Sequence, residues 1–449
     1  MKPDLLNDPV PTLVRRIAVP ASVGFFFNTM YNFVDTWCAG LLSTDALAAL
    51  SLSFPVFFML VVAGNGLGQG GTALIANALG RGDKEEARSI FAHAVMLAGG
   101  AGVVLTVVGI FSAEWLFVQL GAAGSYLTTA LSYMHVILSG LTFFVLQMTL
   151  NSALSAQGDT KTYRNVLVGG FFANCLLNPW FMFGWLGFPA MGISGIALAT
   201  VLIQVAGSFL LWTYIKRSEF GSGLGATHWQ PRKAVFWRIA TQAVPASLNM
   251  LTVAVGIFVI TWFVSQFSKE AVAAYGIATR IEQVVLLPTI GLNFATLSLV
   301  GQNFGAGRRD RVREVWLVAL KYGVGMMVLG GILVWLVRDY AMGWFTEDQA
   351  VIRHGADYLG IAAVTLCAYP ILFVTVFMLQ GLKQPAFGLW MGLYRQFLAP
   401  MLVFQALAFL FGWGIWGIWW GIALVTWSGA LFALWWGWRK LDPVRFGPG

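Results

Sequence analysis

The feature that most constrains this chain is a succession of apolar runs, each long enough to cross a lipid bilayer. A membrane-spanning helix needs about 20 predominantly apolar residues. Runs of that length are predicted at 14–38, 50–72, 90–112, 128–150, 163–184, 192–215, 237–262, 272–297, 317–337, 355–379, 390–410 and 415–437. Of the 449 residues 58% are hydrophobic and 10% are charged, whereas a soluble domain has about 25% charged residues. The sequence therefore predicts an all-α integral membrane protein with twelve transmembrane helices.

The basic residues predict how these helices are oriented. The net charge is +8, and loops that remain in the cytoplasm retain positive charge. With the N-terminus inside, most Lys and Arg residues fall on cytoplasmic connections, among them Lys84, Arg88, Arg311, Lys383 and Arg395. We therefore expect a multi-pass inner-membrane protein with both termini in the cytoplasm. Because the charges are spread thinly over short loops, they do not indicate nucleic-acid binding.

The two halves of the chain resemble each other. Residues 43–88 align without a gap on residues 268–313, a shift of 225. The matching positions include Ser43 with Ser268, Gly66 with Gly291, Gly82 with Gly307 and Arg88 with Arg313. A Gly-Ile-x-Gly-Ile motif also opens the last helix of each half, at Gly192 and at Gly414.

This repeat predicts the domain organisation. Six helices per half is an even number, so both halves have the same orientation and a pseudo-two-fold axis along the membrane normal relates them. We predict an N-lobe at 1–215, a cytoplasmic linker at 216–236 and a C-lobe at 237–449.

Of the 19 acidic residues, two lie well inside predicted spans, Asp35 and Glu282. An ionisable side chain within the membrane is costly and indicates a functional site. Asp35 ends a stripe with Asn28, Tyr31 and Asn32, which the helical period places on one face. Turning that face to lipid would cost on the order of several kcal/mol, so we expect it to line the lobe interior. Asp35 could then bind and release a proton; the alternative is an Asp at the outer helix end that only accepts hydrogen bonds.

Three polar residues are suitable neighbours for this carboxyl group. Asn174 and Asn178 share one face of the fifth helix, and Thr200 lies on the sixth. Asn and Thr can hydrogen-bond a carboxyl group in either protonation state, although polar residues also join helices in membranes. Pro20 interrupts the hydrogen bonding of the first helix; it is either a hinge that responds to protonation of Asp35 or a static kink.

The remaining intramembrane charges are Arg280 and Glu282. Side chains at i and i+2 do not face each other on a helix, so each pairs with another helix or lines a cavity. The three Cys residues lie far apart without His or Cys at metal-ligand spacing, and no metal site is expected. Neither a P-loop nor a cluster of catalytic side chains is present. We therefore do not expect an enzyme, and the energy for any transport must come from an ion gradient.

Several motifs are typical of one transporter family. They are Asn32-Phe-Val-Asp35-Thr, the loop from Gly80 to Arg88, Asn174-Cys-Leu-Leu-Asn178-Pro179, Gly192 to Thr200, Ala274 to Gln283 and Val300 to Gly307. In these motifs the chain resembles the multidrug and toxic compound extrusion (MATE) family over nearly its whole length. The resemblance implies a two-lobe antiporter, here expected to be a monomer without a cofactor, that exports lipophilic cations using protons or sodium ions.

The resemblance also implies site residues. In the DinF-like bacterial branch, the N-lobe site contains a first-helix Asp, an Asn and an acidic residue on the fifth helix, and a sixth-helix Thr. The matching residues here are Asp35, Asn174, Asn178 and Thr200. Asn178 departs from the acidic residue of many relatives, and a single carboxylate is a poor sodium site because hard cations prefer several anionic oxygens. We therefore predict proton-coupled export, with sodium coupling or flipping of lipid-linked oligosaccharides as alternatives.

Overall fold

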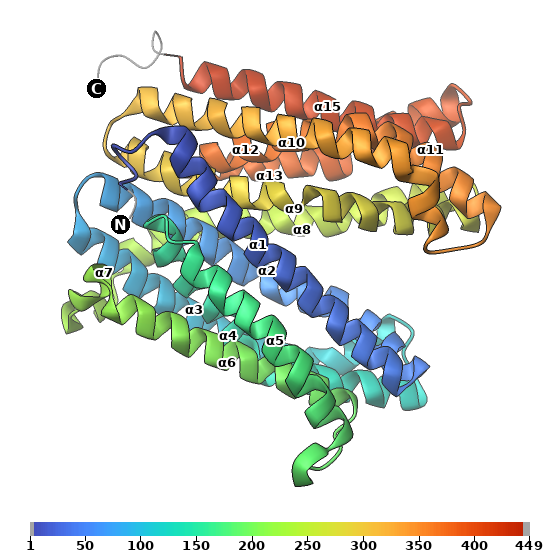
Figure 1. Ribbon diagram of the computed structural model, residues 1–449, viewed down its shortest axis with the longest axis horizontal. Coiled ribbons are helices and arrows are strands. Elements are labelled where there is room, and N and C mark those ends of the chain that lie inside the picture. Colours follow the sequence, from blue (N-terminus) through green and yellow to red (C-terminus); the bar gives the residue numbers. More distant parts are fainter. Residues whose placement is uncertain (1–3, 443–449) are drawn as a thin grey trace. The chain divides into compact units, whose positions relative to one another are not determined.

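Every regular element of the chain is helical in the computed structural model, which describes residues 4–442 (Figure 1). Eleven of the helices described there are long and apolar enough to cross a membrane, and the bent pair Gln349–Thr365 and Ala368–Gly381 makes a twelfth span if the pair is counted as one. The structure confirms the predicted class of an all-α multi-pass membrane protein.

The first half of the chain contains six long helices. They are α1 (Val10–Leu42), α2 (Thr44–Gly80), α3 (Lys84–Gln119), α4 (Gly124–Ala156), α5 (Lys161–Phe183) and α6 (Ile193–Arg217), with the short η1 (Trp185–Gly187) between the last two. Two short helices follow, α7 (Glu219–Ser222) and η2 (Ala226–Trp229). Each predicted span of this half falls on one of the long helices, and most helices extend beyond the apolar run that predicted them.

The second half begins with three long helices, α8 (Lys233–Ser265), α9 (Lys269–Gly305) and α10 (Arg309–Gly343). The predicted span at 355–379 corresponds to two helices, α11 (Gln349–Thr365) and α12 (Ala368–Gly381), with a bend of 49° between them. The chain ends with α15 (Ile415–Lys440).

The eleventh span is irregular. It consists of α13 (Ala386–Leu393), the π-helical η3 (Tyr394–Leu398), α14 (Ala399–Phe404) and the π-helical η4 (Gln405–Leu410). Our assignment of Arg395 to a cytoplasmic connection is wrong, since Arg395 lies in η3 within this span. Single π-helical turns insert one extra residue into a helix and often occur at functional sites.

Packing divides the chain into two compact units. The N-unit is the continuous segment Val23–Ser247, and the C-unit combines the chain up to Ser22 with the chain from Leu248 onward. The predicted lobes follow the sequence repeat, whereas packing divides the chain inside α1 and inside α8. The beginning of α1 therefore packs with second-half helices, and the beginning of α8 packs with first-half helices.

The sequence repeat corresponds to a repeat in local structure. Helices α2 and α9 have the same length, and their bounds differ by the same shift of 225. Ser43 Oγ accepts a hydrogen bond from the Ala46 amide, and Ser268 Oγ accepts one from Ala271, each at 3.0 Å. Such N-caps satisfy an otherwise unpaired amide at the helix start. Ser43 and Ser268, which matched in sequence, thus cap the corresponding helix in each half.

Two of the matched glycines allow close helix contacts. A Cβ atom on Gly291 of α9 would lie 2.2 Å from Ser22 Oγ of α1, and a Cβ atom on Gly66 of α2 would lie 1.9 Å from Ser247 Oγ of α8. Ser22 also donates a hydrogen bond to the Pro288 carbonyl at 3.1 Å. Within each unit, the first part of α1 or α8 is therefore packed directly against the backbone of a helix from the other half.

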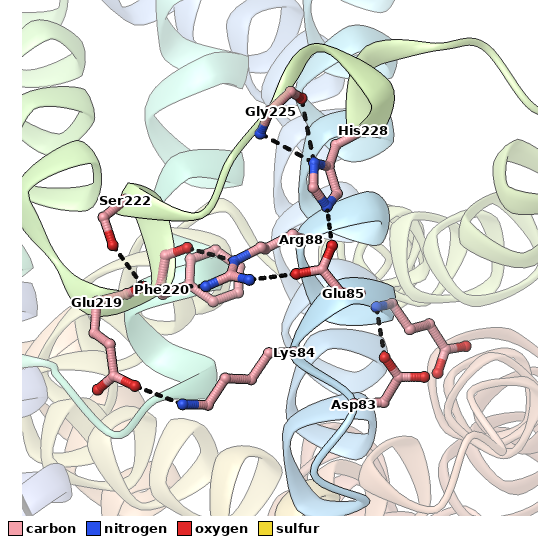
Figure 2. Close-up of polar contacts among 10 residues, drawn as sticks. Asp83, Lys84, Glu85, Arg88, Glu219, Phe220, Ser222, Gly225 and His228 are labelled. Carbon is pink, nitrogen blue, oxygen red and sulfur yellow. Dashed lines mark hydrogen bonds and ion pairs between the residues drawn. The ribbon is translucent and has the colours of Figure 1, made fainter.

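The segment that links the two halves is fixed to the start of α3 (Figure 2). His228 Nε2 lies 2.9 Å from Glu85 Oε2, and Arg88 Nε donates to the Phe220 carbonyl at 2.9 Å. Arg88 also pairs with Glu85. Because all of these residues belong to the N-unit, the linker is a folded part of that unit.

Candidate functional site

A buried carboxyl group lies at the junction of α1, α5 and α6 in the N-unit. Asp35 is 6% exposed. Asn174 Nδ2 and Asn178 Nδ2 donate hydrogen bonds to Asp35 Oδ1 at 2.8 and 2.7 Å. Thr200 Oγ1 lies 3.4 Å from Asp35 Oδ2. The structure therefore brings together the four residues that the sequence comparison had grouped.

Local structure explains how α5 and α6 reach the same carboxyl group. Asn174 and Asn178 are one turn apart and share a face of α5. Beyond them, the amide of Met191 donates to the Phe181 carbonyl at 3.0 Å, and the amide of Gly192 donates to the Met182 carbonyl at 3.2 Å. These bonds attach the start of α6 to the end of α5, which places Thr200 beside the two asparagines.

Oxygen atoms without partners surround this carboxyl group. Tyr31 is buried one turn before Asp35, and within residues 4–442 its hydroxyl group has no hydrogen-bond partner. The same is true of Asn174 Oδ1 and Asn178 Oδ1. The site thus has one carboxylate and several spare acceptors, a set that suits a proton, a water molecule or a monovalent cation.

The predicted polar stripe on α1 is divided. Tyr31 and Asp35 are buried as expected, but Asn28 and Asn32 are exposed, and Asn32 Nδ2 donates to the Asn28 carbonyl at 2.8 Å. The expectation that all four residues line the lobe interior is wrong for these two asparagines. Position around the helix does not separate the two groups, because Asn28 and Asp35 are only about 20° apart; the packing of neighbouring helices decides which side chains are buried.

Pro20 lies outside the N-unit. It is buried inside α1, which continues as one helix from Val10 to Leu42, and the division between units follows it at Ser22. A hinge at this position stays a prediction.

The second intramembrane acid lies in the C-unit. Glu282 of α9 is 6% exposed, and Tyr358 of α11 donates a hydrogen bond to its Oε2 at 2.9 Å. Glu282 Oε1 is buried and has no hydrogen-bond partner in the described part of the chain. Arg280 is exposed, so the two charges point in different directions, as their i, i+2 spacing requires.

Glu282 lines a cavity whose other polar residues were not predicted. The cavity has a volume of about 220 Å³ and is also lined by Arg395, Tyr358 and Tyr369. Arg280 is not among the residues that line it. A signal was present for Arg395, which is a charged residue inside an apolar run of spanning length. None was present for the tyrosines, which resemble other aromatic residues of membrane helices.

Comparison with known proteins identifies the family. The MatE family model matches residues 20–180 and 245–404, which together make up more than half of the chain. The chain belongs to the MatE family. Members of the MatE family are membrane transporters, and the two matched segments coincide with the two halves of the internal repeat.

Two relatives with described functions align with most of this MatE chain. It is 29% identical over 346 residues to a probable multidrug resistance protein NorM of Thermotoga maritima, covering 75% of this chain and 73% of the relative. It is 27% identical over 401 residues to a FAD transporter of Shewanella oneidensis, covering 87% and 86%. These similarities show that this protein is a transporter and not an enzyme.

Solved structures share the fold. A multidrug resistance MATE family transporter in an outward-facing conformation superimposes with a TM-score of 0.90 and 25% identity over 99% of this chain and 98% of that one. A MOP superfamily transporter from Pyrococcus furiosus superimposes with a TM-score of 0.92 and 24% identity, again over 99% and 98%. The two-lobe transporter fold is therefore established for this MatE chain.

Proposed function

We propose that this MatE transporter exports lipophilic organic cations in exchange for protons, with Asp35 as the group that carries the proton. The observation that supports this best is the set of hydrogen bonds from Asn174, Asn178 and Thr200 to a buried carboxyl group. Relatives described as multidrug resistance or multidrug export proteins support the export of several drugs.

The donors around Asp35 are arranged so that both protonation states can be accommodated. Two amide groups donate to Oδ1, and an amide N–H cannot become an acceptor. The proton would therefore bind Oδ2, which faces the Thr200 hydroxyl group at 3.4 Å. A hydroxyl group can rotate from donor to acceptor, so proton uptake requires a change at Thr200 and leaves the two asparagine bonds in place.

This proton would be exchanged for the exported cation. One proton against one monovalent cation moves no net charge, so the exchange would be driven by the pH gradient alone. Each pH unit contributes about 1.4 kcal/mol. In the cycle that we propose, proton uptake from outside displaces the bound cation, and proton release inside restores the site for the next one.

The proposed setting is the inner membrane, with both termini in the cytoplasm and the transporter acting as a monomer without a cofactor. The loops that would then face the cytoplasm carry most of the basic residues, in agreement with the positive-inside rule. The linker follows the same pattern, since Arg217, Arg232 and Lys233 lie in or beside it.

Sodium coupling is a second candidate, and the spare oxygens of Asn174 and Asn178 favour it. Carbonyl oxygens beside a carboxylate are ligands that hard cations prefer. The site contains a single carboxylate, however, and this favours the proton.

Dissipation of a proton gradient in inside-out vesicles tests the proposal. Ethidium is added in sodium-free buffer to vesicles containing the unmodified protein, Asp35→Asn or Asp45→Asn. The last variant is the control, because it removes the same charge from an exposed position at the start of α2. We expect ethidium to dissipate the gradient with the unmodified and control proteins and not with Asp35→Asn.

Other outcomes would contradict the proposal in distinct ways. Dissipation by Asp35→Asn at the full rate would remove Asp35 from the coupling. Activity that appears only after sodium is added would establish the second candidate. No response to ethidium under either condition would contradict the export of organic cations.

A further inference from the structure

The cavity inside the C-unit is separate from the site around Asp35. Its lining residues come from α8, α9, α11, α12, α15 and the irregular eleventh span. Its volume of about 220 Å³ is below the 300–1,000 Å³ typical of pockets for drug-sized ligands. Apolar and aromatic side chains form most of the wall, so the cavity suits a small ligand with an apolar body.

The acidic group in this cavity is the Glu282 carboxylate, and only one of its two oxygen atoms has a hydrogen-bond partner in the described residues. Tyr358 donates to Glu282 Oε2 at 2.9 Å, whereas Oε1 is buried and lacks any partner among residues 4–442. The rings of Tyr275 and Tyr358 lie edge to face, with centroids 5.5 Å apart, and both line the cavity. A carboxylate beside aromatic rings is an environment that attracts an ammonium group.

Arg395 lines the same cavity, and none of the ion pairs in the described part of the chain involves its guanidinium group. Arg395 lies over the rings of Tyr369 and Phe373, 5.7 Å from each centroid. These two rings are stacked at 5.9 Å with an interplanar angle of 14°. The place of Arg395 in the π-helical η3 brings it into the cavity wall. The guanidinium group can bind a carboxylate or phosphate through two parallel hydrogen bonds.

Glu282 and Arg395 therefore line one small cavity with opposite charges that attract each other but form no direct ion pair in the described residues. Glu282 is buried and Arg395 is half-buried, so each charge is partly removed from water at a cost, and a ligand that pairs with both charges would offset that cost. A simple cation would leave Arg395 unmatched and would be repelled by it, and a simple anion would do the same with Glu282. We propose that this cavity binds a small zwitterion, with its amino group at Glu282, its acidic group at Arg395 and an apolar body along the aromatic wall.

Three probes with the same phenyl group test this assignment on the purified full-length protein. L-phenylalanine carries both charges, phenethylamine carries the amino group and 3-phenylpropionate carries the acid. Binding of each is measured by titration calorimetry. We expect phenylalanine to bind at least about tenfold more tightly than either of the others, because it alone satisfies both charges. This comparison requires no variant and therefore does not depend on a substituted protein folding.

Variants then locate the site. Glu282→Gln and Arg395→Gln are each expected to weaken phenylalanine binding about tenfold or more. Arg280→Gln is the matched control, since Arg280 lies on the same helix as Glu282 but is exposed and outside the cavity. Phenethylamine binding as tightly as phenylalanine would replace the proposal with a cation site, and equal binding of 3-phenylpropionate would replace it with an anion site. Absence of binding by all three probes up to about 10 mM, or equal weakening in Arg280→Gln, would overturn it.

Discussion

Asn178 Nδ2 donates a hydrogen bond to Asp35 Oδ1 at 2.7 Å across 143 positions of the sequence. The resemblance to the DinF-like branch implies an acidic residue at this position in many relatives. An acid at this position would place a second carboxylate against the first, and two like charges would need a cation between them. The amide group instead donates a hydrogen bond and allows Asp35 to be ionised without a metal ion.

The first prediction follows from this contact. Asn178→Asp adds a second anionic oxygen donor, which hard cations prefer, and we expect sodium to stimulate ethidium export by the variant severalfold while leaving the unmodified protein unaffected. Asn178→Ala is the control, because it removes the donor without adding charge. Export is measured with and without sodium at constant ionic strength. If Asn178→Asp responds to sodium no more than Asn178→Ala does, the residue does not select the coupling ion.

The second prediction compares two neighbours of Asp35. A hydrogen bond to a charged group contributes about 1.5–3 kcal/mol, which corresponds to about a tenfold or larger change in rate. Asn174 donates at 2.8 Å, whereas the hydrogen bond from Thr200 is longer, at 3.4 Å, and is therefore weaker. We expect Asn174→Leu to slow ethidium-driven proton release at least about tenfold and Thr200→Val to have a smaller effect.

The outcome also tests the role given to the Thr200 hydroxyl group. Initial rates are compared at equal amounts of membrane-inserted protein. A larger loss in Thr200→Val than in Asn174→Leu would mean that the rotating hydroxyl group, rather than the fixed amide, limits proton transfer.

The sequence predicts the architecture well because its signals are local. Span length and the 225-residue shift identify the helices and the repeat, and the N-caps at Ser43 and Ser268 follow the same register. The sequence also predicts two neighbours of Asp35, because the i, i+4 spacing of Asn174 and Asn178 places them on the same face of α5. Asn28 and Asn32 show the limit: spacing defines a broad polar face, but only packing decides which edge of it is buried.

The cavity of the C-unit cannot be predicted from span length or from residue spacing. Glu282, Tyr358 and Arg395 lie on α9, α11 and η3, and no spacing rule relates them. The π-helical turns of η3 and η4 add residues to the helical repeat, which changes the direction of every later side chain in the span. The sequence can report that Arg395 is a charge among apolar residues, but its direction requires the three-dimensional structure.

The third prediction concerns the glycine contacts at which α1 and α8 join the opposite half. A Cβ atom on Gly66 would lie 1.9 Å from Ser247 Oγ and 2.5 Å from the Ala243 carbonyl oxygen. Overpacking of this kind costs about 1–3 kcal/mol, so we expect Gly66→Ala to lower the thermal unfolding temperature. Ser247→Gly should not rescue it, because the carbonyl oxygen remains.

Gly99→Ala is the control for this experiment. Gly99 lies inside α3 with no atom within 4 Å of an added Cβ, so alanine there should stabilise the helix by about 0.5–1 kcal/mol. Equal unfolding temperatures for Gly66→Ala and Gly99→Ala, or full rescue by Ser247→Gly, would contradict a direct backbone contact.

The last prediction concerns the linker. Arg88 has a side chain 12% exposed and donates to the carbonyl groups of Phe220 and Glu219, whereas the ion pair of Lys84 with Glu219 is exposed (Figure 2). Removing this partly buried donor leaves the Phe220 carbonyl group unpaired at a cost of about 1–3 kcal/mol, but an exposed ion pair contributes about 0–1 kcal/mol. We expect Arg88→Ala to release the linker, so that trypsin cleaves near Arg217 and Arg232 at least about fivefold faster. Lys84→Ala should be cleaved at the unmodified rate. Comparable acceleration in both variants would mean that surface charge, and not the partly buried guanidinium group of Arg88, fixes this segment to α3.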